Sequence, residues 1–123
     1  MDQKKIVSYK DLIVWQKAVD LTEAVYNLTS DFPVSEQYGL TSQMRRAAVS
    51  IASNIAEGKT RRTQKDFHNF LGIAFASGAE LETQVVIAKR LGYGKKEKYS
   101  IVDAIFNEVI RMLNSLFHKT SPN

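Results

Sequence analysis

Apolar residues recur every three to four positions along most of this chain, the spacing that places them on one face of an α-helix. Pro33 and Pro122 leave the long stretch between them without a helix-breaking proline. The periodicity predicts four helices, over residues 9–31, 36–57, 64–91 and 96–118. Joined by short loops, these helices should form a single all-α domain over residues 1–123, an antiparallel up-down-up-down four-helix bundle.

Residues that favour helix ends lie between these segments. Ser8-x-x-Asp11 and Thr63-x-x-Asp66 resemble capping boxes, and Ser35 is a favourable cap for the second helix. Gly58 and Gly92 lie where the second and third helices are expected to stop.

The predicted helices differ in how much of their surface is apolar. The fourth has one apolar and one polar face, as expected for a helix that meets a core once. The first carries two neighbouring apolar stripes, the second is rich in small residues over 47–56, and the third places Phe75 and Val86 roughly opposite its core stripe. The inward face of the second helix is expected to contain Leu40, Met44, Ala47, Ile51 and Ile55.

This excess of apolar surface predicts self-association, because a monomer would leave a contiguous apolar patch in water. Scattered surface hydrophobics, which need no partner, are the alternative. Glu80 or Glu82 can face Arg45 or Arg46 on a neighbouring helix or subunit, which would form a structural ion pair. The candidate interface residues are Phe75, Val86, Trp15, Arg45, Arg46 and Glu80.

Composition narrows the class of protein. The 123 residues are 44% hydrophobic and 24% charged, with no cysteine, which is typical of a globular domain without disulfides or thiolate metal sites. No stretch approaches the roughly 20 apolar residues of a membrane span, so no membrane partner is expected. The N-terminal residues lack the apolar segment of a signal peptide, which predicts a cytoplasmic protein.

Patterns of catalytic or metal-binding residues are absent from the sequence. Neither His68 nor His118 has a glutamate three residues before it, as a di-metal bundle would need. Glu80 and Glu82 are two residues apart on one helix, so their carboxylates point in different directions and cannot share a proton. No nucleophile elbow, phosphate loop or zinc-protease motif occurs. We therefore expect no catalytic residues, no metal and no cofactor, and do not expect an enzyme.

The predicted topology gathers positive charge at one end. In an up-down bundle the start of the first helix, the loop between the second and third and the end of the fourth share one end. Eight basic residues fall there against four acidic ones, which accounts for the whole net charge of +4. The basic residues are Lys4, Lys5, Lys10, Lys59, Arg61, Arg62, Lys65 and Lys119, and the acidic residues are Asp2, Asp11, Glu57 and Asp66.

Such an end is expected to bind polyanions, RNA or DNA, with an affinity that falls steeply with salt. Few aromatic residues lie near it, so recognition should be directed at the backbone and weakly selective for sequence. The alternative is a protein-interaction scaffold with no nucleic-acid role, in which the charge only maintains solubility. The main contributors to nucleic-acid binding are expected to be Lys59, Arg61, Arg62 and Lys65, with Lys4, Lys5 and Lys10 beside them.

Several short motifs, taken together, resemble those of one protein family. They are the run Asp11–Ala18, Phe32-Pro33, Glu36-x-Tyr38-Gly-Leu40, Gln43–Ala48, Ser50-Ile51, Asn54–Gly58, Phe67–Leu71, Ser77–Leu81 and Leu91-Gly92. In this order they resemble the bacterial four-helix bundle family, also called the 23S rRNA intervening-sequence protein family, over about residues 9–94.

The resemblance implies a non-enzymatic protein that assembles as a homopentamer, in agreement with the excess apolar faces. The family is named after reading frames within insertions in 23S rRNA genes, which does not establish an action on ribosomal RNA. A relative in diversity-generating retroelements is an accessory protein that binds a reverse transcriptase and nucleic acid. The partners implied are therefore further copies of the chain and RNA, DNA or a nucleic-acid-processing protein.

Overall fold

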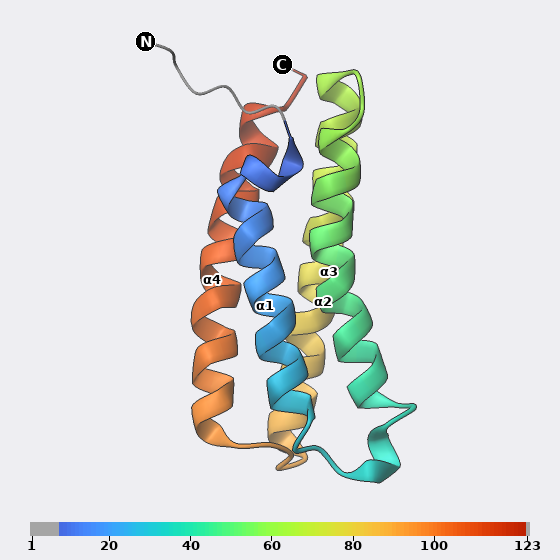
Figure 1. Ribbon diagram of the computed structural model, residues 1–123, viewed down its shortest axis with the longest axis vertical. Helices are drawn as coiled ribbons and strands as arrows, with labels where there is room; N and C mark the ends of the chain where they lie inside the picture. The colour runs from blue at the N-terminus through green and yellow to red at the C-terminus, as the bar shows by residue number, and fades with distance from the viewer. Residues whose placement is uncertain (1–7, 123) are drawn as a thin grey trace.

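The computed structural model describes residues 8–122, and within them the chain is helical without a strand. The elements are two short 3₁₀ turns, η1 (Tyr9–Asp11) and η2 (Val34–Glu36), and four helices, α1 (Ile13–Thr29), α2 (Leu40–Lys59), α3 (Gln64–Arg90) and α4 (Lys96–Lys119). The helices run alternately down and up (Figure 1), so the start of α1, the α2–α3 turn and the end of α4 share one end. We call this the upper end (residues 8–12, 57–66 and 117–122), and the lower end holds residues 30–39 and 90–98.

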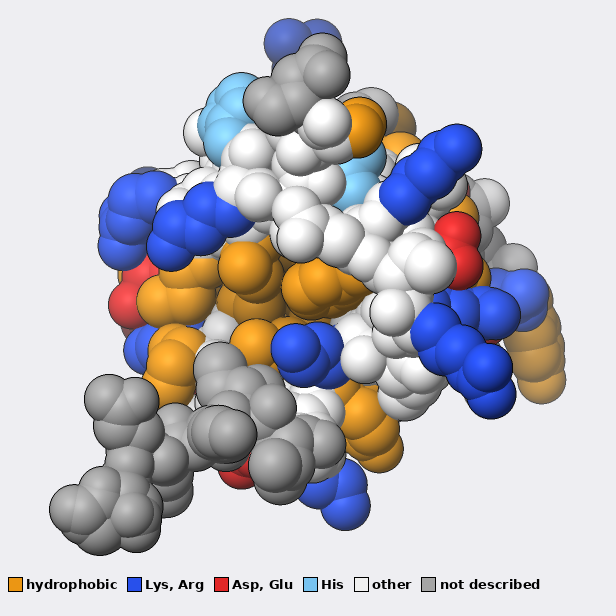
Figure 2. All heavy atoms as spheres, turned by 90° about the horizontal axis from the view of Figure 1, so that it is seen from above, with side chains coloured by type: hydrophobic (Ala, Val, Ile, Leu, Met, Phe, Trp, Pro, Cys, Tyr) orange, Lys and Arg blue, Asp and Glu red, His pale blue; other side chains and the backbone are white. Residues whose placement is uncertain are grey.

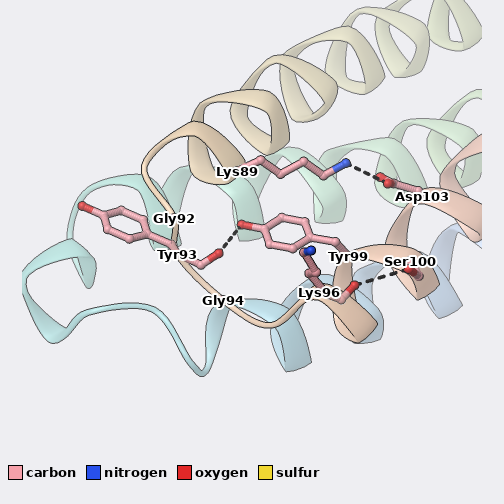
Figure 3. A pocket seen from close by; sticks show the side chains of 8 residues that line it. All are labelled: Lys89, Gly92, Tyr93, Gly94, Lys96, Tyr99, Ser100 and Asp103. Carbon is pink, nitrogen blue, oxygen red and sulfur yellow. Dashed lines mark hydrogen bonds and ion pairs between the residues drawn. The ribbon is translucent and has the colours of Figure 1, made fainter.

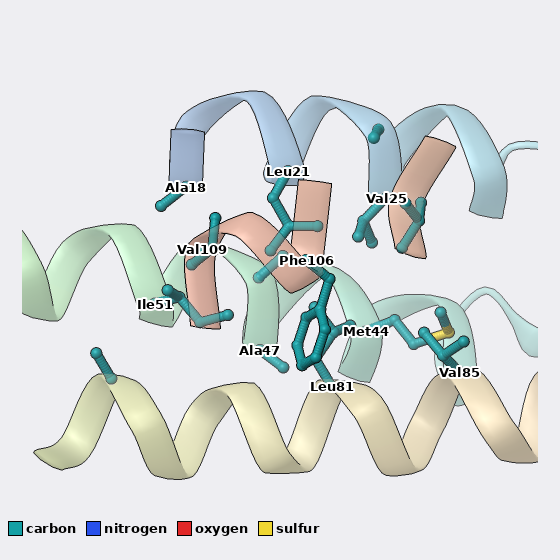
Figure 4. Close-up of a cluster of buried hydrophobic side chains, with 14 of the residues drawn as sticks. Ala18, Leu21, Val25, Met44, Ala47, Ile51, Leu81, Val85, Phe106 and Val109 are labelled. Carbon is teal, nitrogen blue, oxygen red and sulfur yellow. The ribbon is translucent and has the colours of Figure 1, made fainter. Parts of the chain in front are cut away.

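Each helix packs against two others and so helps to close the bundle around one core. α1 contacts α2 and α4, and α3 contacts the same two helices. All four contribute to the buried cluster, as Figure 4 shows for Leu21 of α1, Ile51 of α2, Leu81 of α3 and Val109 of α4. On α2, the predicted inward residues Met44, Ala47, Ile51 and Ile55 are buried and Leu40 is partly buried, which confirms that assignment.

α1 begins later than the sequence predicted. The Ser8 hydroxyl accepts a hydrogen bond from the Lys10 backbone N–H at 3.1 Å, but it caps only η1. Leu12 then has an extended backbone, with φ of −75° and ψ of 125°, which separates η1 from α1. The capping-box interpretation of this segment is therefore wrong for α1, whose first residue is Ile13.

α2 also begins later, with Gly39 at its N-cap position, and the side chain that accepts its first backbone N–H is one that the sequence analysis missed. Ser35 lies within η2, so its prediction as the cap is wrong. The Glu36 carboxylate instead accepts the backbone N–H of Leu40 at 3.0 Å, and it accepts the Tyr93 hydroxyl at 3.0 Å through its other oxygen. One side chain thus fixes the start of α2 and joins it to the α3–α4 turn.

The α2–α3 connection depends on a close approach at Gly58. α2 continues through this buried glycine to Lys59, so the prediction that Gly58 stops the helix is wrong. A Cβ at this position would lie 2.6 Å from Phe70 Cβ and 3.0 Å from a Phe67 ring carbon, which explains the glycine by packing. The predicted cap of α3 is confirmed, since the Thr63 hydroxyl accepts from the Asp66 backbone N–H at 3.1 Å.

The α3–α4 turn at the lower end contains two glycines in the left-handed region. Gly92 and Gly94 have φ of 75° and 80°, and α3 ends just before them at Arg90. An open hollow of about 550 Å³ lies beside this turn (Figure 3), where the Tyr99 hydroxyl donates to the Tyr93 carbonyl at 2.7 Å. The glycine conformations let the chain reverse within a few residues.

α3 is more apolar than the sequence analysis anticipated. By length and composition this helix could cross a membrane, because its most apolar 18 residues have a mean hydropathy of 1.3. The expectation that no stretch approaches this limit is therefore wrong, although one such helix is weak evidence and a core helix meets the same criterion. Part of the apolar surface faces the core through Leu71 and Leu81, and part is exposed at Ile73 and Ile87.

Candidate nucleic-acid interface

Six of the predicted basic residues lie together at the upper end of the structure. They come from η1, the α2–α3 turn and the end of α4. The same end has three acidic residues, so the net charge of its described residues is six minus three, or +3. Seen from above (Figure 2), Lys and Arg side chains surround the rim of this end, with His and hydrophobic side chains between them. The six are Lys10, Lys59, Arg61, Arg62, Lys65 and Lys119, whereas Lys4 and Lys5 lie outside the described residues.

Within the described part of the chain, most of these cations form no ion pair. Arg61 pairs with Glu57 one turn earlier at 2.9 Å, and among residues 8–122 this is the one ion pair of the upper end. The lower end differs, because Lys98 and Lys95 lie 2.8 and 4.0 Å from the Asp31 carboxylate. The hydrogen bond from Lys98 and the neighbouring positive charges lower the pKa of Asp31. The basic residues of the upper end without an ion pair in the described part are Lys10, Lys59, Arg62, Lys65 and Lys119.

Two of the basic side chains lie over aromatic rings of α3. The Lys59 ammonium is 5.6 Å from the centre of the Phe67 ring, and the Arg61 guanidinium is 4.7 Å from that of Phe70. These contacts hold the side-chain stems against the bundle. Phe70 was not identified from the sequence, where it reads only as one more residue of the apolar stripe.

A histidine joins two of the three segments that form the upper end. His68 of α3 stacks on Phe117 of α4 at 4.0 Å, and its Nδ1 lies 3.0 Å from the buried Thr120 hydroxyl oxygen. That hydroxyl donates to the Leu116 carbonyl at 2.8 Å, which leaves it to accept from His68. Gln64 also donates to the Lys119 carbonyl at 3.3 Å, so the α2–α3 turn and the end of α4 are fixed relative to each other.

The candidate interface residues of α3 occupy different environments. Phe75 is partly buried and meets Phe117 edge to face, with ring centres 6.1 Å apart, so its predicted position opposite the core is wrong. The reason is that α4 packs on that flank of α3. Val86 is 46% exposed, as predicted.

Trp15 and Arg45 are held by neighbours within the protomer. Trp15 packs against the core and meets Tyr9 with ring centres 5.3 Å apart. The Arg45 Nε donates to the Thr29 hydroxyl at 2.9 Å, and its guanidinium lies 4.4 Å from the centre of the Tyr26 ring. Within the protomer, Arg45 therefore serves the α1–α2 contact.

The remaining two candidates, Arg46 and Glu80, lie across a seam between α2 and α3. Both are exposed and line one hollow of about 310 Å³, yet within the described residues they form no ion pair. Ile73, Glu80 and Ile87 follow one another at seven-residue spacing and so share one face of α3. We call the surface formed by Gln43, Arg46, Ser50, Ile73, Glu80 and Ile87 the α2–α3 face.

Fold and surface together define a small four-helix bundle with a cationic end, and its described residues contain no cluster able to hold a metal ion. The chain belongs to the 23S rRNA-intervening sequence protein family, whose pattern matches residues 10–115, so the resemblance drawn from the motifs is confirmed. It is similar to a crystal structure from Bacteroides thetaiotaomicron VPI-5482, described as a protein with unknown function from the S23 ribosomal protein family. The two share 28% identity with a TM-score of 0.76, over 85% of this chain and 98% of that one. No curated protein matches the chain.

Proposed function

We propose that this protein is a non-enzymatic helical bundle that binds nucleic acid, or a nucleoprotein partner, through its upper end. The observation that carries the proposal is the set of five basic side chains that share one end without an acidic partner among the described residues. Unpaired cations can neutralise phosphates without first breaking an ion pair.

The chemistry of this end favours the nucleic-acid backbone over the bases. Lys59, Arg62 and Lys65 lie on or beside a short turn, so they can follow the phosphates of many sequences. Each phosphate neutralised releases counterions, and binding should weaken linearly with salt on logarithmic axes. Affinity is expected to vary little with sequence.

A titration of labelled single-stranded RNA and DNA by fluorescence anisotropy, repeated over about 50 to 200 mM salt, tests this site. We expect replacement of Lys59, Arg61, Arg62 and Lys65 by Ala to weaken binding at least tenfold and to reduce the salt slope by about three to four. Replacement of Arg90, Lys95, Lys96 and Lys98 at the lower end removes the same charge and is the matched control. Equal loss in both variants would refute the site, and no binding at low salt would refute the function.

We also propose that copies of the chain associate through the α2–α3 face, in the homopentamer that the family resemblance implies. Two large aliphatic side chains support this, because Ile73 and Ile87 are 49% and 44% exposed. The opposite charges of Arg46 and Glu80 are available to a neighbouring copy. Self-association would align several upper ends and so strengthen their combined field.

A further inference from the structure

An open groove runs between α1 and α2 and begins at the upper end. It has a volume of about 360 Å³, within the range of small-molecule sites. Its α1 wall is aromatic and aliphatic near the upper end and polar further down the helix, at Thr22 and Glu23. The other wall belongs to the small-residue segment of α2, whose short side chains give the groove its depth. The lining residues include Tyr9, Trp15 and Val19 on one side and Ala52, Ser53 and Ala56 on the other.

Two aromatic rings form a corner at the upper part of this groove. Tyr9 of η1 and Trp15 of α1 have ring centres 5.3 Å apart and planes inclined at 68°. Both side chains are partly exposed, and Trp15 is supported from behind by the core. A flat ring that enters the groove can therefore lie against one aromatic face while the other ring closes its edge.

Two lysines lie on the segments that continue from the groove at its upper end. Lys10 follows Tyr9 directly, and Lys59 lies one helical turn beyond Ala56, where its ammonium is 5.6 Å from the centre of the Phe67 ring. η1 packs against α2, which brings the two segments together. Neither lysine has an acidic partner among residues 8–122. An apolar slot for a flat ring thus lies beside segments that carry two lysines, each on a flexible side chain that suits a flanking phosphate.

We propose that this groove accepts a base of single-stranded nucleic acid, stacked against Trp15, with the flanking phosphates on Lys10 and Lys59. The proposal rests on the function proposed above and specifies its ligand. Bases within a duplex are paired and stacked, so their faces are not available to the groove, whereas stacking on aromatic side chains suits single strands of any sequence.

Trp15 is the one tryptophan of the chain and reports directly on the groove. Three probes of equal phosphate number distinguish stacking from charge: a single-stranded ten-residue oligodeoxyadenylate, the same backbone without bases, and a duplex. We expect the oligodeoxyadenylate alone to quench Trp15 emission, and to bind about 5- to 150-fold more tightly than the strand without bases, the effect of one stacked base.

Ala52→Gln fills the groove and keeps the fluorophore. It should abolish the quenching and reduce oligodeoxyadenylate affinity to that of the strand without bases, whose own binding stays unchanged. Ala104→Gln, an equivalent change at an exposed position of α4, should alter neither measurement. Far-ultraviolet circular dichroism of both variants establishes that the helices are intact.

Equal affinity for the strands with and without bases, with unchanged Trp15 emission, would overturn the base site while the proposed polyanion binding stands. Failure of all three probes to bind would overturn both. A smaller mass in solution for Ala52→Gln, together with Trp15 emission that changes with protein concentration, would assign the groove to a second copy of the chain and also overturn the proposal.

Discussion

Gly58 is the residue at which the bundle has least room for a side chain. Because a Cβ would fall 2.6 Å from Phe70 Cβ, Gly58→Ala must push α2 and α3 apart. We expect it to lower the free energy of unfolding by about 1 to 3 kcal/mol despite the better helix propensity of alanine. Urea denaturation measures the change.

Gly72→Ala is the matched control for this substitution. The same Cβ there would have one neighbour within 4 Å, a Phe117 ring carbon at an ordinary 3.5 Å. It should therefore leave the free energy of unfolding unchanged or raise it by up to about 1 kcal/mol. Equal loss in both variants would contradict the close approach at Gly58.

The ionisation of one side chain, that of Tyr99, is expected to affect the stability of the fold at alkaline pH. Burial of its ring, with a smaller contribution from the Asp103 carboxylate, raises the pKa of Tyr99 from 10.0 to about 12. A pKa above that of the unfolded chain stabilises the fold fully below pH 10, and this contribution is lost as the pH rises through about 12. We expect urea denaturation to show a decrease of about 1 to 2 kcal/mol in the free energy of unfolding over this range.

Other groups also titrate between pH 10 and 12, so Tyr99 is tested by comparing the pH dependence of two variants. Tyr99→Phe should flatten the pH dependence, whereas Tyr38→Phe, at a side chain 91% exposed, should retain it. A residual slope is expected from Tyr93, because its hydrogen bond to the Glu36 carboxylate raises its pKa. Parallel curves for the two variants would exclude a role for Tyr99.

At the scale of elements, Glu36 holds the beginning of α2. Its carboxylate accepts from Leu40 N–H and from the Tyr93 hydroxyl, so Glu36→Ala removes a helix cap and leaves the hydroxyl without its partner. We expect a loss of about 1 to 2 kcal/mol in the free energy of unfolding, measured by urea denaturation. Ser35→Ala, the substitution at the cap predicted from sequence, should cost less than about 0.5 kcal/mol.

The helices were predictable because each has a continuous apolar face, and the Thr63 cap was predictable because hydroxyl and partner lie within one turn. The starts of α1 and α2 were not. Ser8 satisfies a local 3₁₀ turn instead of the helix, and the first N–H of α2 is accepted by Glu36, which lies before the Gly39 N-cap. The role of Gly58 could not be predicted from the sequence either. Its close approach to Phe67 and Phe70 arises only when the two helices pack together.

At the scale of the whole molecule, topology was sufficient to predict which end is basic. The topology could not predict which charged side chains form ion pairs, because pairing depends on whether a side chain of one segment can reach a side chain of another. Lys98 reaches Asp31 across the α1–α4 contact, and so part of the positive charge at the lower end is paired. The groove beside Trp15 was likewise beyond sequence reasoning, which treated that residue as a possible contact between subunits.

From the exposed apolar side chains of the α2–α3 face, we expect the whole molecule to self-associate. Ile73→Glu should place a charge among apolar side chains at the contact and reduce the mass measured by light scattering toward the 13.9 kDa protomer, with helicity retained. Ile101→Glu is the matched control, because Ile101 is 54% exposed on α4, away from this face.

Charge reversal tests the same face independently. If Arg46 of one copy meets Glu80 of the next, Arg46→Glu or Glu80→Arg alone should set like charges against each other and weaken association. The double variant should restore much of it, because the attraction is re-established with the signs exchanged. A mass of one protomer for the unaltered protein at micromolar concentration would exclude the assembly, and unchanged association in both single variants would move the contact to another face.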